Sequence, residues 1–220
     1  INIFEKYSTE DSIGSVVLTG AGNKSFIAGA DIALMSSFSP EKAFEYSIKG
    51  QHLVKTIANY SKPVFGVING YALGGGCEIA LACHLRYSSP NAIFGQPEVK
   101  LGIIAGWGGT QNLSRLVGPS NALDLLLSGR NIPSDEAFKM GLINGVFEEK
   151  LLDNVLEVAF KINNNSPYAI SQTIKSVKNG YNKDLDEALE IESLSFKKTF
   201  ANSESKIGLK SFLKKEKPKF

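Results

Sequence analysis

The chain has 220 residues, of which 43% are hydrophobic and 21% charged, a composition that excludes a disordered or fibrous protein. Its 24 basic and 22 acidic residues nearly balance, which argues against a dedicated nucleic-acid binder, and no apolar run reaches the roughly 18 residues that span a bilayer. Two cysteines and two histidines favour a reducing compartment and argue against both a disulfide framework and a closed four-ligand zinc site.

Strands and helices alternate along the first part of the chain. The apolar, β-branched segment 13–18 predicts a buried strand, and the Gly/Ala-rich segment 20–31 predicts a loop. Ser39-Pro40-Glu41 is a typical helix start, so we predict a helix from there to about Tyr60 and then a second buried strand at 64–68. This alternation indicates an α/β fold with parallel strands.

The middle of the chain is rich in glycine, whereas helix formers dominate its last third. After Gly74–Gly76 we expect a short buried helix at 77–85, followed by short strands, irregular glycine-rich segments and helices. The expected elements are strands at 86–88, 92–94 and 143–147, a glycine-rich segment at 95–109, and helices at 109–117, 120–127, 134–141, 149–163, 167–179, 184–200 and 204–214. We therefore place a soft boundary between an α/β core at 1–148 and a helical region at 149–220.

The segment Gly74-Gly75-Gly76-Cys77-Glu78 is the first candidate for chemistry. Glycines at the start of a helix leave backbone N–H groups free at its positive dipole end, which favours an oxyanion site. The spacing matches neither the dinucleotide fingerprint nor the P-loop. Close helix packing would also explain the glycines, but it does not explain a carboxylate in an apolar segment, because a buried charge needs a partner or a purpose.

Three further segments are candidates, each with a simpler structural interpretation. Glu98 follows a turn, where most glutamates are merely solvated, but two carboxylates facing one apolar pocket would suit acid/base catalysis with one raised pKa. The small residues of 28–31 let the backbone approach a ligand, or form a tight turn. The segment 102–109 (GIIAGWGG) is either a pocket wall or a surface loop with a buried anchor.

Together these segments resemble the enoyl-CoA hydratase/isomerase (crotonase) superfamily, over essentially all 220 residues. The matching stretches are SVVLTGAGNKSFIAGADI, KPVFGVINGYALGGGCEIALAC, AIFGQPEVKLGI, GWGGTQNLSRLVG and SFLKKEK. The resemblance implies a crotonase-like spiral of ββα turns with a C-terminal helical region that assembles a homotrimer or homohexamer. It also implies that the family's N-terminal strand and first helix region, which help to hold CoA, are missing from this chain.

The resemblance implies a specific chemistry as well. The substrate is an acyl-CoA thioester, and the backbone N–H groups of Ala30 and Gly75 hold the oxyanion of an enolate-like species. Glu78 positions a water molecule and acts as its base, while Glu98 supplies the proton to the α-carbon in a syn addition. The same pair dehydrates a 3-hydroxyacyl-CoA such as 3-hydroxybutyryl-CoA in reverse. Neither a metal nor a cofactor is implied, because coenzyme A is part of the substrate.

Other positions match substrate or CoA contacts of the family. Gly106 corresponds to a backbone position near the water, and Phe212 and Lys215 correspond to C-terminal positions that reach CoA, often from a neighbouring subunit. The complete set is Ala28, Asp31, Ile32, Leu73, Gly74, Pro97, Leu101, Gly106, Trp107, Phe212 and Lys215.

The chain departs from the family pattern at four positions, and two of them lie in the 102–109 segment. Ala33 stands where Lys is common, His84 where Asp is common, and Ala105 where Pro is frequent. Trp107 stands where Ala or Phe is common, and we expect its bulk to narrow the acyl pocket and to favour short chains.

The leading hypothesis is therefore an enoyl-CoA hydratase. The alternatives are an enoyl-CoA isomerase, a branched-chain hydratase of the methylglutaconyl-CoA type, and a non-catalytic CoA-binding or RNA-associated scaffold. A net charge of +2 and two intact glutamates argue against the scaffold. We expect an acyl-CoA substrate, neither a membrane nor a nucleic acid as partner, and a cytoplasmic location, or the mitochondrial matrix if the source is eukaryotic.

Overall fold

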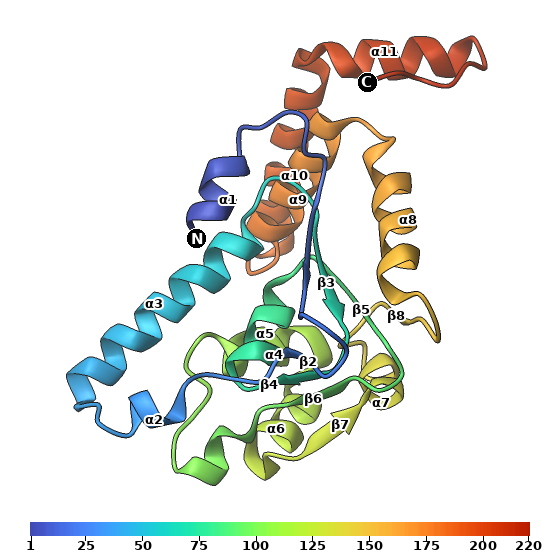
Figure 1. The fold of residues 1–220 in the computed structure, drawn as a ribbon. Helices are drawn as coiled ribbons and strands as arrows, with labels where there is room; N and C mark the ends of the chain where they lie inside the picture. The colour runs from blue at the N-terminus through green and yellow to red at the C-terminus, as the bar shows by residue number, and fades with distance from the viewer. The chain divides into compact units, whose positions relative to one another are not determined.

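The computed structural model describes all 220 residues, and its strands form two four-stranded sheets (Figure 1). The strand orders are β1-β3-β5-β8 and β2-β4-β6-β7. The pairs β2–β4, β3–β5, β4–β6 and β5–β8 are parallel, and only β6–β7 is antiparallel among the pairs with an assigned register. The predicted α/β class with parallel strands is confirmed.

The chain visits the two sheets in turn and then adds helix, so that a ββα unit recurs three times without a repeat in the sequence. The first unit holds β1 (Val16–Thr19), β2 (Ser25–Ile27), α2 (Ile32–Met35) and α3 (Pro40–Ala58). The second holds β3 (Val64–Ile68), β4 (Tyr71–Leu73) and α4 (Gly75–Ala82). The third holds β5 (Leu85–Ser88), β6 (Ile93–Gly95), the 3₁₀ helix η1 (Pro97–Leu101), α5 (Gly109–Val117) and α6 (Pro119–Ser128).

The remaining elements close the sheets and form the helical end of the chain. They are α1 (Asn2–Tyr7), β7 (Asn131–Pro133), α7 (Ser134–Lys139), β8 (Gly145–Val146), α8 (Leu151–Asn163), α9 (Pro167–Gly180), α10 (Leu185–Ala201) and α11 (Ser203–Leu213). The four predicted C-terminal helices are thus confirmed. None of the helices has the length and apolar character needed to cross a membrane.

Six short elements, α1, β2, α2, β4, η1 and β7, were not predicted, and the predicted buried helix has different ends. The expected loop at 20–31 contains β2, and β4, β7 and α1 have no counterpart among the expected elements. The three missed strands have three residues each and are ordered by their neighbours, because β4 lies between β2 and β6 and β7 closes the same sheet. The buried helix begins at Gly75 instead of 77 and ends at Ala82, since Cys83 has extended backbone angles.

Helix α4 is the centre of the core. All eight of its residues are buried, and it packs against α3, α5, β2 and β4. Strand β3, which has five buried residues, lies in the other sheet. A helix that is apolar on every side belongs inside a protein, so Glu78 is carried into the core by the element that bears it.

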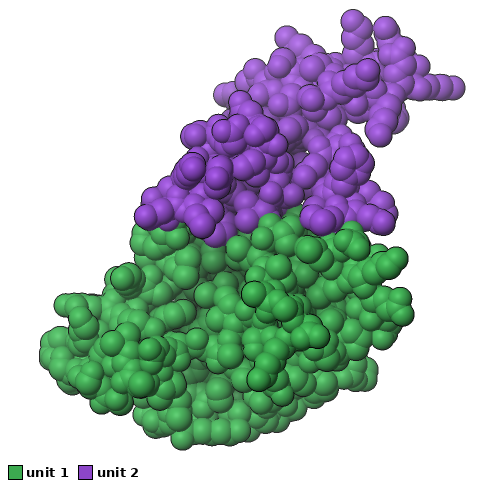
Figure 2. All heavy atoms as spheres, viewed as in Figure 1, with its two compact units in different colours: residues 1, 17–58, 64–155 green, residues 2–16, 59–63, 156–220 purple.

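The chain divides into two compact units, which Figure 2 colours separately. The first comprises residues 1, 17–58 and 64–155, and the second comprises residues 2–16, 59–63 and 156–220. This grouping follows proximity and not chain order, so the expected division into 1–148 and 149–220 stays a prediction.

The second unit is assembled from three separated segments. Phe4 of α1 packs edge-on against Tyr60, with ring centroids 5.0 Å apart, and Lys62 Nζ donates to the backbone carbonyls of Tyr7 and Glu10 at 3.2 and 2.5 Å. Helices α9 and α10 pack against each other (Figure 1). These contacts order α1, which has too few residues to be a stable helix by itself.

Candidate active site

Three segments that carry candidate residues leave the same edge of one sheet. Strands β2, β4 and β6 are adjacent and parallel, so their carboxyl ends lie together, and they are followed by 28–31, 74–78 and 96–98 respectively. A Cβ atom added to Gly76 would overlap the carbonyl oxygen of Ile27, and one added to Gly74 would lie 2.8 Å from Glu98 Oε1. The sequence-separated segments therefore meet in the first unit.

Glu78 lies in the first turn of α4 and is only 2% exposed. Its Oε1 atom accepts hydrogen bonds from the backbone N–H groups of Trp107 and Gly109, both at 2.7 Å. Burial raises the pKa of Glu78 to about 7, the two N–H bonds oppose this rise, and the charge of Glu98 adds to it. Both bonds end on Oε1, which leaves Oε2 for a ligand, and the group can hold or release a proton near neutral pH.

Glu98 lies in η1 and is half-buried. The side-chain amide nitrogen of Gln96, in the orientation that its neighbours require, donates to both carboxyl oxygens of Glu98 at 3.2 Å. Gln96 itself is 1% exposed, so this contact fixes the carboxyl group from inside the protein. Burial raises the pKa of Glu98 above its ordinary value of 4.5.

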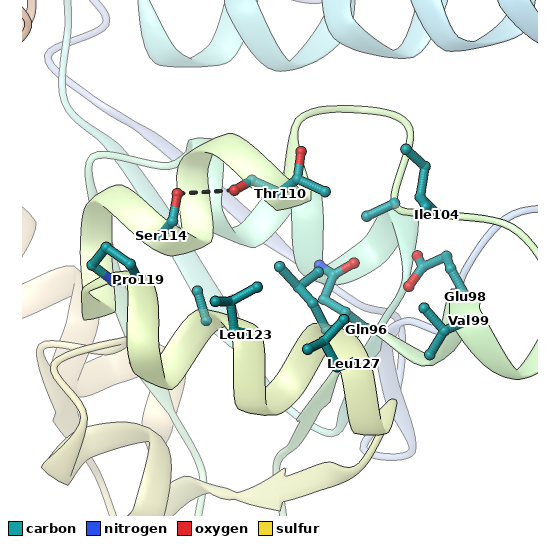
Figure 3. Close-up of a pocket in the computed structure, with 12 residues that line it drawn as sticks. Gln96, Glu98, Val99, Ile104, Thr110, Ser114, Pro119, Leu123 and Leu127 are labelled. Atoms are coloured by element: carbon teal, nitrogen blue, oxygen red, sulfur yellow. Dashed lines mark hydrogen bonds between the residues drawn. The ribbon is translucent and has the colours of Figure 1, made fainter.

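A cavity of about 330 Å³ adjoins Glu98 (Figure 3). Figure 3 shows Val99 and Ile104 beside the carboxyl group, and Leu123 and Leu127 of α6 lie across the same cavity. These neighbours are apolar, and an apolar environment disfavours the ionised carboxylate, in agreement with the raised pKa of Glu98.

The two predicted oxyanion donors are near this edge of the sheet. Gly75 is the first residue of α4, where an N–H group has no acceptor within the helix and the dipole is positive. Ala30 follows β2, and a Cβ atom on its neighbour Gly29 would lie 3.4 Å from the carbonyl oxygen of Leu73, at the end of β4. The two loops therefore pack together, and the donor roles of Ala30 and Gly75 stay predictions.

Helix α3 holds the 106–107 segment against the site. The carbonyl oxygen of Gly106 accepts from Ser47 Oγ at 2.5 Å and from Gln51 Nε2 at 3.2 Å. The ring of Tyr46 lies 5.5 Å from the Trp107 ring, centroid to centroid. Since Trp107 also donates its N–H to Glu78, the position of α3 is linked to the position of the carboxylate.

The remaining predicted site residues fall into two groups. Ala28, Asp31, Ile32, Leu73, Gly74, Pro97 and Leu101 all belong to the strand-end segments or their flanks in the first unit. Asp31 has a local role there, because its side chain caps α2 by accepting from Leu34 N at 3.0 Å. Phe212 lies in the last turn of α11 and Lys215 two residues beyond its end, in the second unit, and both are exposed. The CoA contacts proposed for both groups stay predictions.

Cys77 and His84 have structural surroundings. Burial raises the pKa of the Cys77 thiol to about 12, so the thiol is protonated at neutral pH and is no nucleophile. His84 Nδ1 accepts from the backbone N–H of Val64 at 3.0 Å, which ties the residue to β3. No group of three or more His, Cys, Asp or Glu side chains could hold a metal ion.

Several residues that shape the site were not predicted. Gln96 positions Glu98, Gly109 donates to Glu78, and Ser47 and Gly50 of α3 contact the 106–107 segment. A sequence signal exists for Gly50, because a glycine inside a helix costs about 1 kcal/mol relative to alanine and usually has a packing reason. No local pattern distinguishes the other three.

Known proteins match this chain along its whole length. The sequence profile of the family described as enoyl-CoA hydratase/isomerase matches residues 1–220. The short-chain-enoyl-CoA hydratase of Clostridium acetobutylicum is 41% identical over 216 residues, covering 98% of this chain and 83% of that protein. The crotonyl-CoA hydratase of Syntrophomonas wolfei is 43% identical over 212 residues, covering 96% of this chain and 82% of that protein. The crystal structure of an enoyl-CoA hydratase from Bacillus anthracis superposes with a TM-score of 0.95 at 34% identity, covering 100% and 85% of the two chains.

Proposed function

This chain belongs to the enoyl-CoA hydratase/isomerase family, and from that premise we propose that it is a hydro-lyase that adds water to a trans-2-enoyl-CoA. The observation that carries the proposal is a pair of carboxyl groups, Glu78 and Glu98, that reach one sheet edge from different elements and both have raised pKa values. Hydration needs one group to accept a proton and another to donate one. The relatives named above are hydratases, which supports the same reaction.

In the proposed step, water adds across the double bond with one proton accepted and one proton donated by the protein. Glu78, as the carboxylate, takes a proton from water while the water oxygen bonds to the β-carbon, and the electrons of the double bond move toward the thioester carbonyl. Ala30 and Gly75 donate N–H groups to the resulting oxyanion. Glu98, as the acid, then gives its proton to the α-carbon. A proton passes from Glu78 to Glu98 through water to restore the starting state, and the reverse sequence dehydrates a 3-hydroxyacyl-CoA.

Burial raises the pKa of both carboxyl groups, but their hydrogen bonds and immediate neighbours differ in a way that supports opposite roles. Glu78 accepts two backbone N–H bonds, and such bonds favour the charged form that a base needs. Glu98 borders an apolar cavity, and an apolar surrounding favours the protonated form that an acid needs. No cofactor is needed for this chemistry.

The binding of coenzyme A and the assembly of subunits are part of the same proposal. Phe212 is 81% exposed, and several other large apolar side chains of the C-terminal helices are exposed as well. They include Leu185, Leu189, Leu194, Phe196, Phe200, Leu209 and Leu213. An apolar surface of this kind is typical of a subunit interface, so we assign a homotrimer or homohexamer in which Phe212 and Lys215 reach CoA. We assign a cytoplasmic location, or the mitochondrial matrix for a eukaryotic source.

The test is the absorbance of the conjugated thioester of crotonyl-CoA, with product identification by chromatography. The chain should consume crotonyl-CoA and form 3-hydroxybutyryl-CoA, and Glu78→Gln and Glu98→Gln should each lower kcat by about 10²–10⁴-fold while the circular dichroism spectrum is kept. Products with a shifted double bond would identify an isomerase instead. Unchanged absorbance with crotonyl-CoA and with longer and branched enoyl-CoAs, or full activity of either variant, would contradict the proposal.

A further inference from the structure

The indole ring of Trp107 lies in a slot that two glycines create. A Cβ atom added to Gly50 would overlap Cδ1, Cγ and Nε1 of the ring, and a Cβ atom added to Gly75 would lie 2.8 Å from Cζ3 and 3.0 Å from Cε3. The ring is thus held between α3 on one edge and the start of α4 on the other. Any side chain at either glycine would displace it.

Gly50 has no other evident reason to be a glycine. It lies in the interior of the 19-residue helix α3 and is buried, and its φ is not among the positive values found in this chain. Glycine at such a position costs about 1 kcal/mol relative to alanine. The indole ring of Trp107 occupies the space that an alanine side chain at position 50 would fill, which explains the glycine at this position.

Trp107 touches both parts of the proposed reaction. Its backbone N–H is 2.7 Å from Oε1 of Glu78, the proposed base, and its ring contacts Gly75, the proposed oxyanion donor. In a bound enoyl thioester the carbonyl oxygen would lie at Gly75 and the β-carbon at Glu78. The carbons that join these two points would therefore lie beside the indole ring, and we take the rest of the acyl chain to continue along it.

The ring is also held in place. Tyr46 lies 5.5 Å from it at an interplanar angle of 53°, and the carbonyl of the preceding residue, Gly106, is bonded to Ser47 and Gln51. Tyr46, Ser47, Gly50 and Gln51 occupy one face of α3, since residues three and four apart share a helix face. A wall supported in this way cannot be pushed aside by a longer acyl chain at low cost.

From these contacts we propose that Trp107, seated against Gly50, is the specificity-determining residue that limits the length of the acyl group. The inference rests on the proposed function, because it takes Gly75 and Glu78 as the residues that hold the thioester. It assigns to Gly50 a positioning role, exerted through the ring and not through the substrate.

The test compares four-carbon with eight-carbon ligands in the wild type, Trp107→Ala, Trp107→Phe, Gly50→Ala and the double variant Gly50→Ala/Trp107→Ala. Calorimetry measures Kd for butyryl-CoA and octanoyl-CoA, and the absorbance assay measures kcat/KM for the matching enoyl-CoAs. A methylene group in an apolar pocket changes selectivity by at least about tenfold, so Trp107→Ala should raise the preference for the longer chain by that factor or more. Trp107→Phe, which keeps an aromatic wall, should change the preference less.

The Gly50 variants test the seat of the ring. Gly50→Ala alone should lower kcat/KM for crotonyl-CoA by about tenfold or more, because the displaced ring is joined to the N–H group that holds Glu78. Trp107→Ala in the same chain should restore that rate, since the clash is gone. Circular dichroism and thermal unfolding identify any variant that has not folded, and only the folded variants are used to test the role of Gly50.

The outcomes separate the two claims. The ratio of Kd for butyryl-CoA to Kd for octanoyl-CoA reports the chain-length preference without catalysis. A shift of this ratio in Trp107→Ala, with no hydration by any variant, would support the inference and overturn the proposed function. A chain-length ratio that is unchanged in folded Trp107→Ala would overturn the inference, even if crotonyl-CoA is hydrated. Failure of the wild type to bind either acyl-CoA would overturn both.

Discussion

Replacing Gly74 by alanine should damage the site by moving Glu98. Gly74 has φ +53°, a region that L-residues rarely adopt, so any side chain there costs about 1–2 kcal/mol of stability. The added Cβ atom would lie 2.8 Å from Glu98 Oε1, whereas ordinary van der Waals contact begins at 3.4 Å, so the carboxyl group must move by about 0.6 Å. Because a misplacement of about 1 Å can cost 10²-fold in rate, we expect kcat/KM to fall by about tenfold to a hundredfold.

The control is Gly22→Ala. Gly22 has φ +71° and no atom within 4 Å of its added Cβ, so it incurs a similar backbone cost without touching the site. Both variants should lose stability in thermal unfolding, and only Gly74→Ala should lose activity in the crotonyl-CoA assay. Equal kcat/KM values for the two variants would refute the link between Gly74 and the Glu98 carboxyl position.

Three further predictions concern the pH dependence of activity, the pH dependence of stability and a buried cation. Since the pKa of Glu78 is about 7 and the proposed step uses its carboxylate, kcat/KM for crotonyl-CoA hydration should rise as pH increases through 7. Folded Glu78 keeps its proton at pH values above the ordinary pKa of 4.5, so the free energy of unfolding should decrease as pH rises from 4.5 to 7. The contribution of Glu78 to this decrease is about 3 kcal/mol at most, and Glu78→Gln should remove that contribution. Arg86 is 6% exposed and donates to the carbonyls of Leu142, at 2.8 Å, and Cys83. Arg86→Met should therefore lower the free energy of unfolding in urea by about 1–3 kcal/mol. The control Arg115→Met, at an exposed position, should change it by less than about 0.5 kcal/mol. An unchanged free energy for Arg86→Met would show that these hydrogen bonds do not stabilise the fold.

The sequence predicted the long elements well because their signals are local. Ser39-Pro40 marks the start of α3, where Ser39 Oγ accepts from Lys42 N at 3.2 Å, and the apolar run at 64–68 matches β3 at both ends. The three-residue strands β2 and β4 could not be predicted in this way. Three residues carry little periodicity, and these strands are ordered by pairing with segments about 20 to 45 residues away.

The sequence singled out both carboxyl groups of the candidate site but not the residues that hold them in position. Glu78 stands out because a carboxylate is unusual in an apolar segment, and Glu98 because it follows a glycine-containing turn. The family resemblance predicted that the two residues act in one site. The contact of Gly50 with Trp107 spans 57 positions in the chain, so no spacing rule indicates it. Likewise, the bonds from Gln96 to Glu98 depend on the orientation of a buried amide, which only packing decides.

The common edge of β2, β4 and β6 has a consequence for substitutions in the loops that follow these strands. Each strand is followed by a different part of the proposed site, because the proposed oxyanion donors follow β2 and β4 and the proposed acid follows β6. The hydrogen bonds between the strands, which keep the three segments in register, involve none of the reacting side chains. A residue in one of these loops can therefore be exchanged while the strand pairing, which fixes where all three loops begin, stays the same.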